Sequence, residues 1–321
     1  MPLKRLAPSS VLQITSFSDI DAFRPYELVE DARSIALDPA HFSTARAVIR
    51  LPSCRVVVHR SFARILDATY FAPGGLLIMP LEETLQATAN GMPLDAHCLI
   101  AVRGTDDCRF IEPRANLHAM IIFHPGLADR GWFDVEDRLQ ALPCDRNALI
   151  KARDAVFAIL QAASSEPHVF DVAGVAEGLQ ELLLSAIDDL FSLGGGREGR
   201  TEISGGRSAQ LVRLVDDYID AHPTLPIYTA QLATELSVSM RTLGNAITKV
   251  RGMSLHQYIR LKRLWATRAH LLKGGATTIA ASARAHGFHH MGEFAALYRA
   301  TFNETPSATR AYRRQPPKPH W

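Results

Sequence analysis

A glycine-rich segment near the middle of the chain is the feature that most constrains the fold. Residues 192–208 read SLGGGREGRTEISGGRS and hold few apolar side chains. A segment of this composition cannot contribute to a packed core and is typical of a flexible interdomain linker. With 321 residues, the chain is long enough for a separate core on each side. We therefore predict domains at 1–195 and 209–314, a flexible Gly-rich linker at 196–208 and a disordered tail at 315–321.

The sign of the charge changes at the same place. Residues 201–321 carry 16 Lys and Arg against 7 Asp and Glu, whereas residues 1–200 carry 19 against 26. An acidic part joined to a basic part indicates that the basic part meets a polyanion. The alternative is a polar end with no such partner.

The cysteines and the apolar runs bear on the compartment. The four cysteines are scattered without a C-x-x-C pair, which argues against a structural zinc site and against a secreted disulfide framework; they are Cys54, Cys98, Cys108 and Cys144. The chain has neither a long apolar run that would cross a membrane nor the features of a secretory signal. We expect a cytoplasmic, nucleoid-associated protein with no membrane partner.

The first domain is expected to be β-rich and to end in helices. Short runs of β-branched residues alternate with Pro, Gly and Asp turns, which predicts an antiparallel sandwich or small barrel. From about residue 147, apolar residues recur three and four apart, which predicts two trailing helices. The second of these helices carries an apolar stripe that packs on the sheet or, alternatively, forms the seam of a homodimer. The stripe consists of Leu179, Leu182, Leu183, Ile187 and Leu190.

The second domain is expected to be all helical, so the fold class is α+β with two domains. TAQLATELSVSMRTLGNAITKVRG predicts two short helices on a tight turn, a helix-turn-helix at about 229–250. The same pattern returns about fifty residues later, at about 278–302. Thr229, Ser239 and Thr278 are placed to cap helices in the two units, and Gly287 is placed at the second turn.

A predicted helix over 254–273 joins the two units and sets their spacing. It is basic, with Arg260, Lys262, Arg263 and Arg268, which suits contact with phosphates. Twenty residues in a helix span about 30 Å. Successive major grooves on one face of DNA lie about 34 Å apart, so one chain can place a helix in each of two adjacent grooves.

At this point the chain resembles the AraC/XylS family of bacterial transcription regulators, over roughly residues 209–314. The resemblance rests on SVSMRTL, GMSLHQYIRLKRL, the GF pair at 287–288 and TPSATR at 305–310, in the family's order and spacing. The segment GFHHMGEF is similar to the branch that contains the ethanolamine-utilisation regulator EutR. The resemblance implies a cupin-like effector-sensing domain upstream, RNA polymerase as a partner, and activation more often than repression. Asn245 and Ala296 stand where the family often has arginine.

Two histidines and a glutamate at the start of the second recognition helix admit two interpretations. His289, His290 and Glu293 could hold a metal ion. However, such a site needs three or four suitable ligands, and no further Cys, Asp or second His pair lies nearby in sequence. The first residues of such a helix face base edges in the major groove. We favour the second interpretation, with a solvated or capping His290 and a Glu293 that only complements the helix dipole as the alternatives.

The predicted DNA contacts follow from side-chain chemistry. Arg pairs with guanine, Asn with adenine and Glu with cytosine, whereas hydroxyls and amines reach phosphates. For Arg241, a phosphate contact or a solvated charge is the alternative, and for Met291 it is core packing. The predicted base contacts are Arg241, Asn245, His290, Met291 and Glu293. The predicted backbone contacts are Ser239, Thr242, Lys249, His289 and Arg263.

An enzyme is the competing class for the first domain, because cupin folds also host metal-dependent oxygenases. Those enzymes need an H-x-H pair with a further Glu and His, whereas His59, His97, His118 and His124 stand alone in the sequence. We expect no catalytic residue, no metal and no cofactor, and instead a non-catalytic pocket for a small-molecule effector of unknown identity. The resulting prediction is an effector-responsive, sequence-specific DNA-binding transcription regulator. A constitutive or repressing DNA binder with a vestigial sensor is the alternative.

Overall fold

The computed structural model describes residues 3–24, 29–133, 138–193, 199–203, 206–274 and 278–312. The chain divides into two compact units, one made of residues 1–34 and 42–205 and the other of residues 35–41 and 206–321. The predicted tail at 315–321 lies outside the described residues. Within the part of the chain that is described, no helix is both long and apolar enough to cross a membrane.

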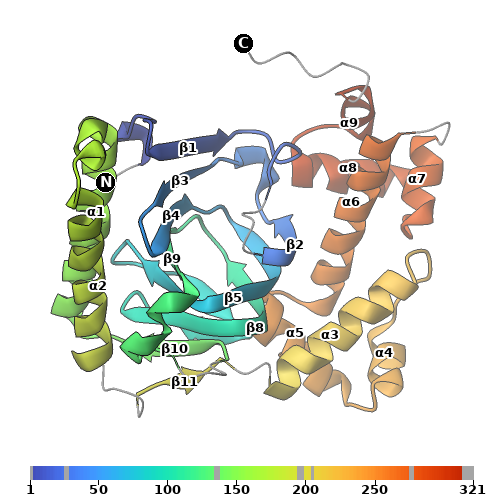
Figure 1. Ribbon diagram of the computed structural model, residues 1–321. Helices are drawn as coiled ribbons and strands as arrows, with labels where there is room; N and C mark the ends of the chain where they lie inside the picture. The colour runs from blue at the N-terminus through green and yellow to red at the C-terminus, as the bar shows by residue number, and fades with distance from the viewer. Residues whose placement is uncertain are drawn as a thin grey trace. The chain divides into compact units, whose positions relative to one another are not determined.

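The N-terminal unit is built on one strongly curved antiparallel sheet (Figure 1). Its strands run in the order β1-β3-β4-β9-β5-β8-β10-β11, with β2 paired to β5, β6 paired to β8 and β7 paired to β6. The strands are β1 (Leu12–Phe17), β2 (Val29–Ala36), β3 (Thr44–Arg50), β4 (Cys54–Arg60), β5 (Arg64–Pro80), β6 (Ala87–Ala89), β7 (Met92–Leu94), β8 (Cys98–Glu112), β9 (Leu117–Phe123), β10 (Gln140–Pro143) and β11 (Thr201–Glu202). Short 3-10 helices lie at Leu3–Arg5, Pro39–His41, Pro125–Arg130 and Pro167–Asp171.

The long strand β5 bends the sheet. It pairs with β8 along most of its length, and its second half also pairs with β9. The register shifts between Ala72 and Leu76, where the sequence reads Pro-Gly-Gly and Gly75 has a φ of 98°. A bulge of this kind turns a strand, and glycine adopts the positive φ without strain. The sheet therefore has an inner and an outer face, each with its own apolar core.

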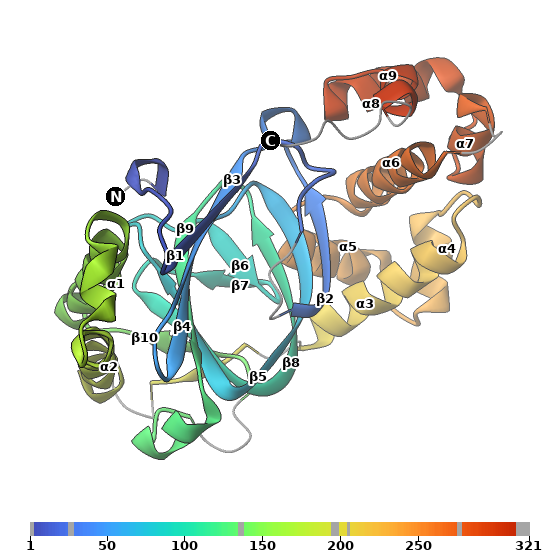
Figure 2. The same ribbon diagram turned by 45° about the horizontal axis from the view of Figure 1, so that its top comes forward.

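Two helices, α1 (Arg146–Ser165) and α2 (Val175–Leu193), cover the outer face of the sheet (Figures 1 and 2). Asp145 caps α1 by accepting hydrogen bonds from the backbone nitrogens of Asn147 and Ala148. The buried stripe of α2 differs in part from the predicted one, because Leu182 is exposed and Leu184 is buried in its place. The two helices and the sheet share one core, as expected for helices that follow a β-rich domain.

Part of the predicted linker is held by the sheet. Residues 194–198 and 204–205 lie outside the described residues. Between them, Thr201 and Glu202 form β11 and pair with β10. Ile203 is buried in the inner core, and its carbonyl accepts a hydrogen bond from Asn90 Nδ2 at 3.0 Å. The sequence does not predict this strand, because the segment is rich in glycine and Ile203 is the only apolar residue among polar neighbours.

In its described part, the C-terminal unit is built of helices (Figure 2), apart from the segment 35–41, which holds the end of β2 and the 3-10 helix Pro39–His41. Its core follows the 3.6-residue repeat of apolar positions that the sequence shows. Its helices are α3 (Gly206–Ala221), α4 (Thr229–Glu235), α5 (Met240–Arg251), α6 (Leu255–Lys273), α7 (Ile279–Ala285), α8 (Met291–Phe302) and α9 (Pro306–Tyr312). A capping box at Ser254 and Gln257 begins α6, which runs from the α3–α5 group to the α7–α9 group.

A partly buried carboxylate, Asp216, joins α3 to α5 and α6. Asp216 accepts hydrogen bonds from Arg251 Nη2 at 2.6 Å, Tyr258 Oη at 2.5 Å and Lys262 Nζ at 2.9 Å. Burial by itself raises the pKa of Asp216, but the charges of Arg251 and Lys262 outweigh it and hold the pKa below its usual range. The carboxylate is therefore ionised and acts as the counter-charge at this helix junction.

Candidate functional sites

The two helix-turn-helix units have the same turn geometry. Val238 N donates to Ala233 O at 2.9 Å, and fifty positions on, Phe288 N donates to Ala283 O at 3.0 Å. The residues before these donors, Ser237 and Gly287, have φ values of 53° and 79°. The duplication seen in the sequence is therefore a duplication of backbone conformation.

The surroundings of the two turns differ. Ser237 is exposed, whereas a Cβ at Gly287 would lie 2.7 Å from Arg263 Nη1 and 3.3 Å from the carbonyl oxygen of Pro223. We expect Gly287→Ser to lower the free energy of unfolding by about 1–2 kcal/mol, since a left-handed residue with a side chain is strained and Arg263 must move. The matched change Ser237→Gly should stay within about 0.5 kcal/mol. Urea unfolding of both variants measures the difference, and equal losses would contradict it.

The first recognition helix, α5, presents a polar outer face. Ser239 caps it by accepting from Thr242 N at 3.0 Å, as the sequence predicts. Leu243, Ile247 and Val250 are buried on the opposite face. The side chains predicted to contact DNA on this helix are all exposed: Ser239, Arg241, Thr242, Asn245 and Lys249.

The second recognition helix, α8, begins after His290. This residue occupies the N-cap position, but its side chain makes no capping hydrogen bond, so capping does not account for it. His289, His290 and Glu293 are exposed. Met291 is partly buried and packs against the cluster that contains Phe294 and Tyr298, which favours the packing interpretation for this residue.

The cations of the connecting helix α6 are largely engaged within the unit. Arg268 is buried and donates to Glu304 and Thr309. Lys262 binds Asp216, and Arg263 donates through Nη2 to the carbonyl of Leu225. The sequence suggested a basic rod facing phosphates, but these three side chains bind other parts of the fold.

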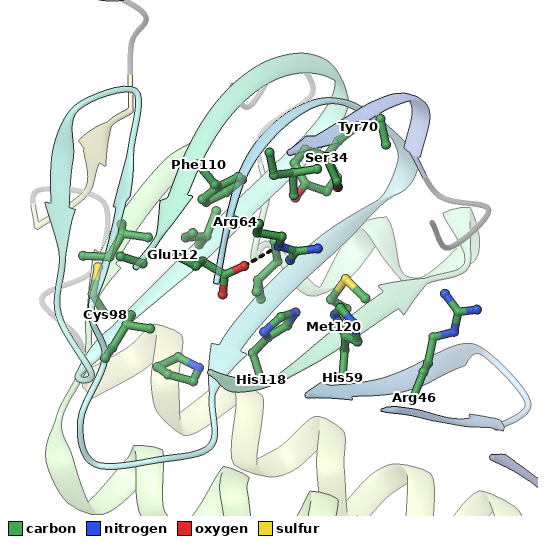
Figure 3. A pocket seen from close by; sticks show the side chains of 18 of the residues that line it. Ser34, Arg46, His59, Arg64, Tyr70, Cys98, Phe110, Glu112, His118 and Met120 are labelled. Atoms are coloured by element: carbon green, nitrogen blue, oxygen red, sulfur yellow. Dashed lines mark hydrogen bonds and ion pairs between the residues drawn. The ribbon is translucent and has the colours of Figure 1, made fainter. Parts of the chain in front are cut away.

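The N-terminal unit contains a second candidate site, a cavity of about 100 Å³. It lies on the inner side of the curved sheet, and side chains from β4, β5, β8 and β9 line it (Figure 3). Most of the wall is apolar, with Leu66, Ile78, Leu94, Ile100 and Phe110 among its residues. The stretch ILDATYFAPGGLLIMP, which passes through β5, contributes four of the lining residues: Leu66, Tyr70, Ile78 and Pro80.

A buried ion pair stands on the wall of this cavity. Arg64 Nε donates to Glu112 Oε2 at 2.6 Å, and each side chain is only 8% exposed. Glu112 Oε1 accepts from Ser61 Oγ at 2.8 Å and from Asn116 Nδ2 at 3.0 Å. Burial alone raises the pKa of Glu112, but the charge of Arg64 and these hydrogen bonds hold it below its ordinary value. The pair is therefore charged.

Two histidines lie beside this ion pair. His59 on β4 and His118 on β9 are directly opposite in the register, and their rings meet edge to face with centroids 5.2 Å apart. Burial, with the charge of Arg64, lowers the pKa of both rings, that of His118 to about 4. Both imidazoles are neutral near pH 7. His59 Nε2 lies 2.9 Å from Thr44 Oγ1, whose hydroxyl donates to the carbonyl of Arg60.

This constellation is not evident from the sequence. His59 and His118 stand alone as strand histidines, and Arg64 and Glu112 lie at the ends of their strands. The one signal available is His118, a polar residue inside the otherwise apolar strand β9. Within the described residues, no group of three or more His, Cys, Asp or Glu side chains is arranged to hold a metal ion.

Comparisons with known proteins concern mainly the helical unit. Residues 232–312 match the family model described as a helix-turn-helix domain. The chain is 34% identical over 102 residues to the probable thc operon regulatory protein of Rhodococcus erythropolis, a match that spans 30% of each chain. It is 27% identical over 254 residues to the XylDLEGF operon transcriptional activator of Pseudomonas putida, covering 75% of this chain and 68% of that protein.

A solved structure also matches. It is a transcriptional regulator from Chromobacterium violaceum, described as containing an AraC-type DNA-binding domain. The sequences are 31% identical, and the match covers 35% of this chain and 99% of that one with a TM-score of 0.32. The Rhodococcus protein is matched over less than a third of its length, whereas the match to the Pseudomonas activator extends across both units of this chain.

Proposed function

Because residues 232–312 match the model of a helix-turn-helix domain, we propose that the whole chain is a cytoplasmic, nucleoid-associated, DNA-binding transcription regulator of the AraC type. The observation that carries the proposal is the pair of helix-turn-helix units with matching turn geometry, joined by the single helix α6. At 19 residues, α6 spans about 28 Å, close to the distance of about 34 Å between successive major grooves. One chain would therefore read two adjacent grooves of double-stranded promoter DNA.

The proposed contact map assigns α5 to one groove and α8 to the next. Exposed Arg241 and Asn245 on α5, and His290 and Glu293 at the start of α8, would read base edges. Met291 packs against the helical core, so it would contact a base only with the part of its side chain that stays exposed. The proposed backbone contacts are Ser239, Thr242, Lys249, His289 and Arg263. Of these, Arg263 would have to release the carbonyl of Leu225 to reach a phosphate.

Arg241 offers the most direct test of base reading. We expect Arg241→Ala to weaken binding to a selected promoter fragment by about 1–3 kcal/mol and to relax the preference at one base pair. Lys249→Ala, in contrast, should weaken binding to all fragments alike and lower the salt dependence. Fluorescence anisotropy on fragments selected from genomic DNA, at fixed salt, measures both effects. A uniform loss for Arg241→Ala would reassign this residue to the DNA backbone.

The N-terminal unit would supply the signal. We propose that it is a cupin-like sensor whose cavity takes a small-molecule effector. Binding of the effector would favour the arrangement in which both recognition helices dock. A match across both units to a protein named as a transcriptional activator supports activation, with RNA polymerase as partner. GFHHMGEF supports placement in the EutR-like branch. The exposed apolar side chains of α1 and α2, Ile150 and Leu182, support a homodimer.

Two other functions remain as outcomes of the same experiments. A constitutive or repressing DNA binder with a vestigial sensor would bind its promoters with an affinity that no small molecule alters. A cupin-type metalloenzyme would retain bound metal on purification, which elemental analysis detects. Promoter selection by full-length protein and by residues 209–321 separates these cases from the proposed regulator. Enrichment of two-part motifs spaced by about one helical turn supports the proposal.

A further inference from the structure

The cavity of the N-terminal unit shows which chemistry its occupant should have. We propose that it binds a compact monocarboxylate, held by the outer nitrogens of Arg64 with its apolar part against the aliphatic wall. This inference rests on the proposed sensor function and names the class of effector. Its basis is the set of polar groups that face the cavity.

The first step concerns the Arg64 guanidinium. Only Nε takes part in the bond to Glu112, and the two outer nitrogens point away from Glu112 on the cavity side (Figure 3). Within the described part of the chain, no hydrogen bond is formed by these two nitrogens. Arg64 is 7% exposed as a whole, and its outer nitrogens open onto the cavity. A planar pair of N–H groups matches the two oxygens of a carboxylate.

The second step concerns the acceptors on the same wall. Glu112 Oε1 already accepts two hydrogen bonds, and Oε2 accepts the bond from Arg64. The carboxylate is therefore occupied by its own neighbours. A ligand that brings further donors would find the Glu112 carboxylate largely occupied, whereas a ligand that brings acceptors would complete Arg64.

The third step concerns His118. Its ring is neutral near pH 7, because burial and the charge of Arg64 lower its pKa to about 4. A neutral imidazole carries one N–H group, and no hydrogen bond within the described residues fixes which nitrogen holds it. His118 lies next to Arg64 on the cavity wall and can add a donor to a carboxylate oxygen (Figure 3). It does so without adding a second positive charge.

The fourth step concerns size and polarity. A cavity of about 100 Å³ is smaller than an engineered cavity of about 150 Å³ that accepts benzene. The occupant therefore has an apolar part smaller than a six-membered ring. The wall that faces this part is supplied by Leu66, Ile78, Leu94, Ile100 and Met120. Hydroxyl groups placed against these aliphatic side chains would lose water without gaining partners, so this part of the occupant is apolar.

Isothermal titration of the full-length protein at pH 7, without DNA, tests the inference. The probes are cyclobutanecarboxylate and butanoate, each compared with its amide of the same shape. We expect at least one acid to bind about ten- to hundredfold more tightly than its amide, the range that a charge-assisted hydrogen bond gives. Equal affinities of acids and amides, or no binding of any of the four compounds, would overturn the proposal.

A double variant locates the preference. Arg64→Gln with Glu112→Gln removes both charges but leaves groups that can bond to each other, and it should bring the acid down to the affinity of its amide. The matched control is Arg60→Gln with Glu82→Gln, an ion pair in the same unit whose side chains are 43% and 37% exposed. The control should keep the preference for the acid.

A second variant covers the case in which the double variant loses its folded circular dichroism spectrum. Arg64→Lys keeps the charge beside Glu112 but lacks the planar fork, and the acid should then bind at least about fivefold more weakly. Unchanged binding in either folded variant would contradict the assignment. Promoter binding is measured in parallel. Selective promoter binding without acid binding would reject this inference alone, whereas acid binding without selective promoter binding would reject the proposed function.

Discussion

Replacing Asp216 by alanine is expected to lower the free energy of unfolding of the C-terminal unit by about 3 kcal/mol or more. The reason is the charge that stays behind. Arg251 is fully buried at 0% exposure. The Asp216 carboxylate accepts hydrogen bonds from Arg251 Nη2 at 2.6 Å and from Lys262 Nζ at 2.9 Å. Removing the carboxylate leaves this buried cation without its main counter-charge at the junction of α3, α5 and α6.

The loss should reach the recognition helix, because Arg251 is the last residue of α5. Hydrogen exchange in α5 and α6 of the full-length protein, together with urea unfolding, measures the effect. Asp217→Ala is the matched control, since Asp217 is the exposed neighbour on the same helix. It should change the free energy of unfolding by no more than about 0.5 kcal/mol. A similar small change for Asp216→Ala would show that this carboxylate does not hold the three helices together.

The features that the sequence predicts best are local ones. The two-domain layout, with an antiparallel sheet domain before a helix-turn-helix domain, is confirmed. In the helical unit, Ser239 and Thr278 cap their helices as predicted, because a cap depends on residues three positions apart. Thr229 is the exception, since α4 is preceded by Tyr228 without a side-chain cap.

The features that the sequence hides depend on contacts between distant residues. Arg64 and Glu112 are 48 positions apart, and they meet because β5 and β8 pair along their length. His59 and His118 meet because β4 and β9 are in register. Periodicity shows which face of a strand is buried, but it does not show which strand lies opposite. For this reason the sequence predicts a small-molecule pocket in this unit but not the residues that line it.

The same limit explains the basic connecting helix. Its cations are evident in the sequence, and a phosphate-facing rod was the simplest interpretation. The acidic partners come from other helices, at Asp216 and Glu304, so the sequence of α6 gives no sign that Lys262 and Arg268 are engaged. The outward-facing charges of the recognition helices, in contrast, follow from the apolar positions on their opposite faces.

Replacing Glu112 by alanine is expected to lower the free energy of unfolding of the N-terminal unit by about 3 kcal/mol or more. The change leaves Arg64 buried beside an empty position, and Ser61 Oγ and Asn116 Nδ2 each lose an acceptor. Glu82→Ala is the matched control, because Glu82 also pairs with an arginine but its side chain is 37% exposed. Glu82→Ala should lower the free energy of unfolding by only about 1 kcal/mol. Urea unfolding followed by circular dichroism measures both variants.

The pH dependence gives an independent check on the charge of Glu112. Its pKa in the folded state lies below the ordinary value, so the folded protein binds fewer protons here than the unfolded chain. The stabilisation is fully present above the unfolded pKa, about 4.3, and is lost as the pH falls through the folded value. Wild-type protein should therefore lose this contribution below about pH 4, whereas Glu112→Ala, which has no carboxyl group at this position, should not. If both proteins lost stability equally with acid, Glu112 would be neutral in the fold, and Arg64 would have no fixed counter-charge beside the cavity.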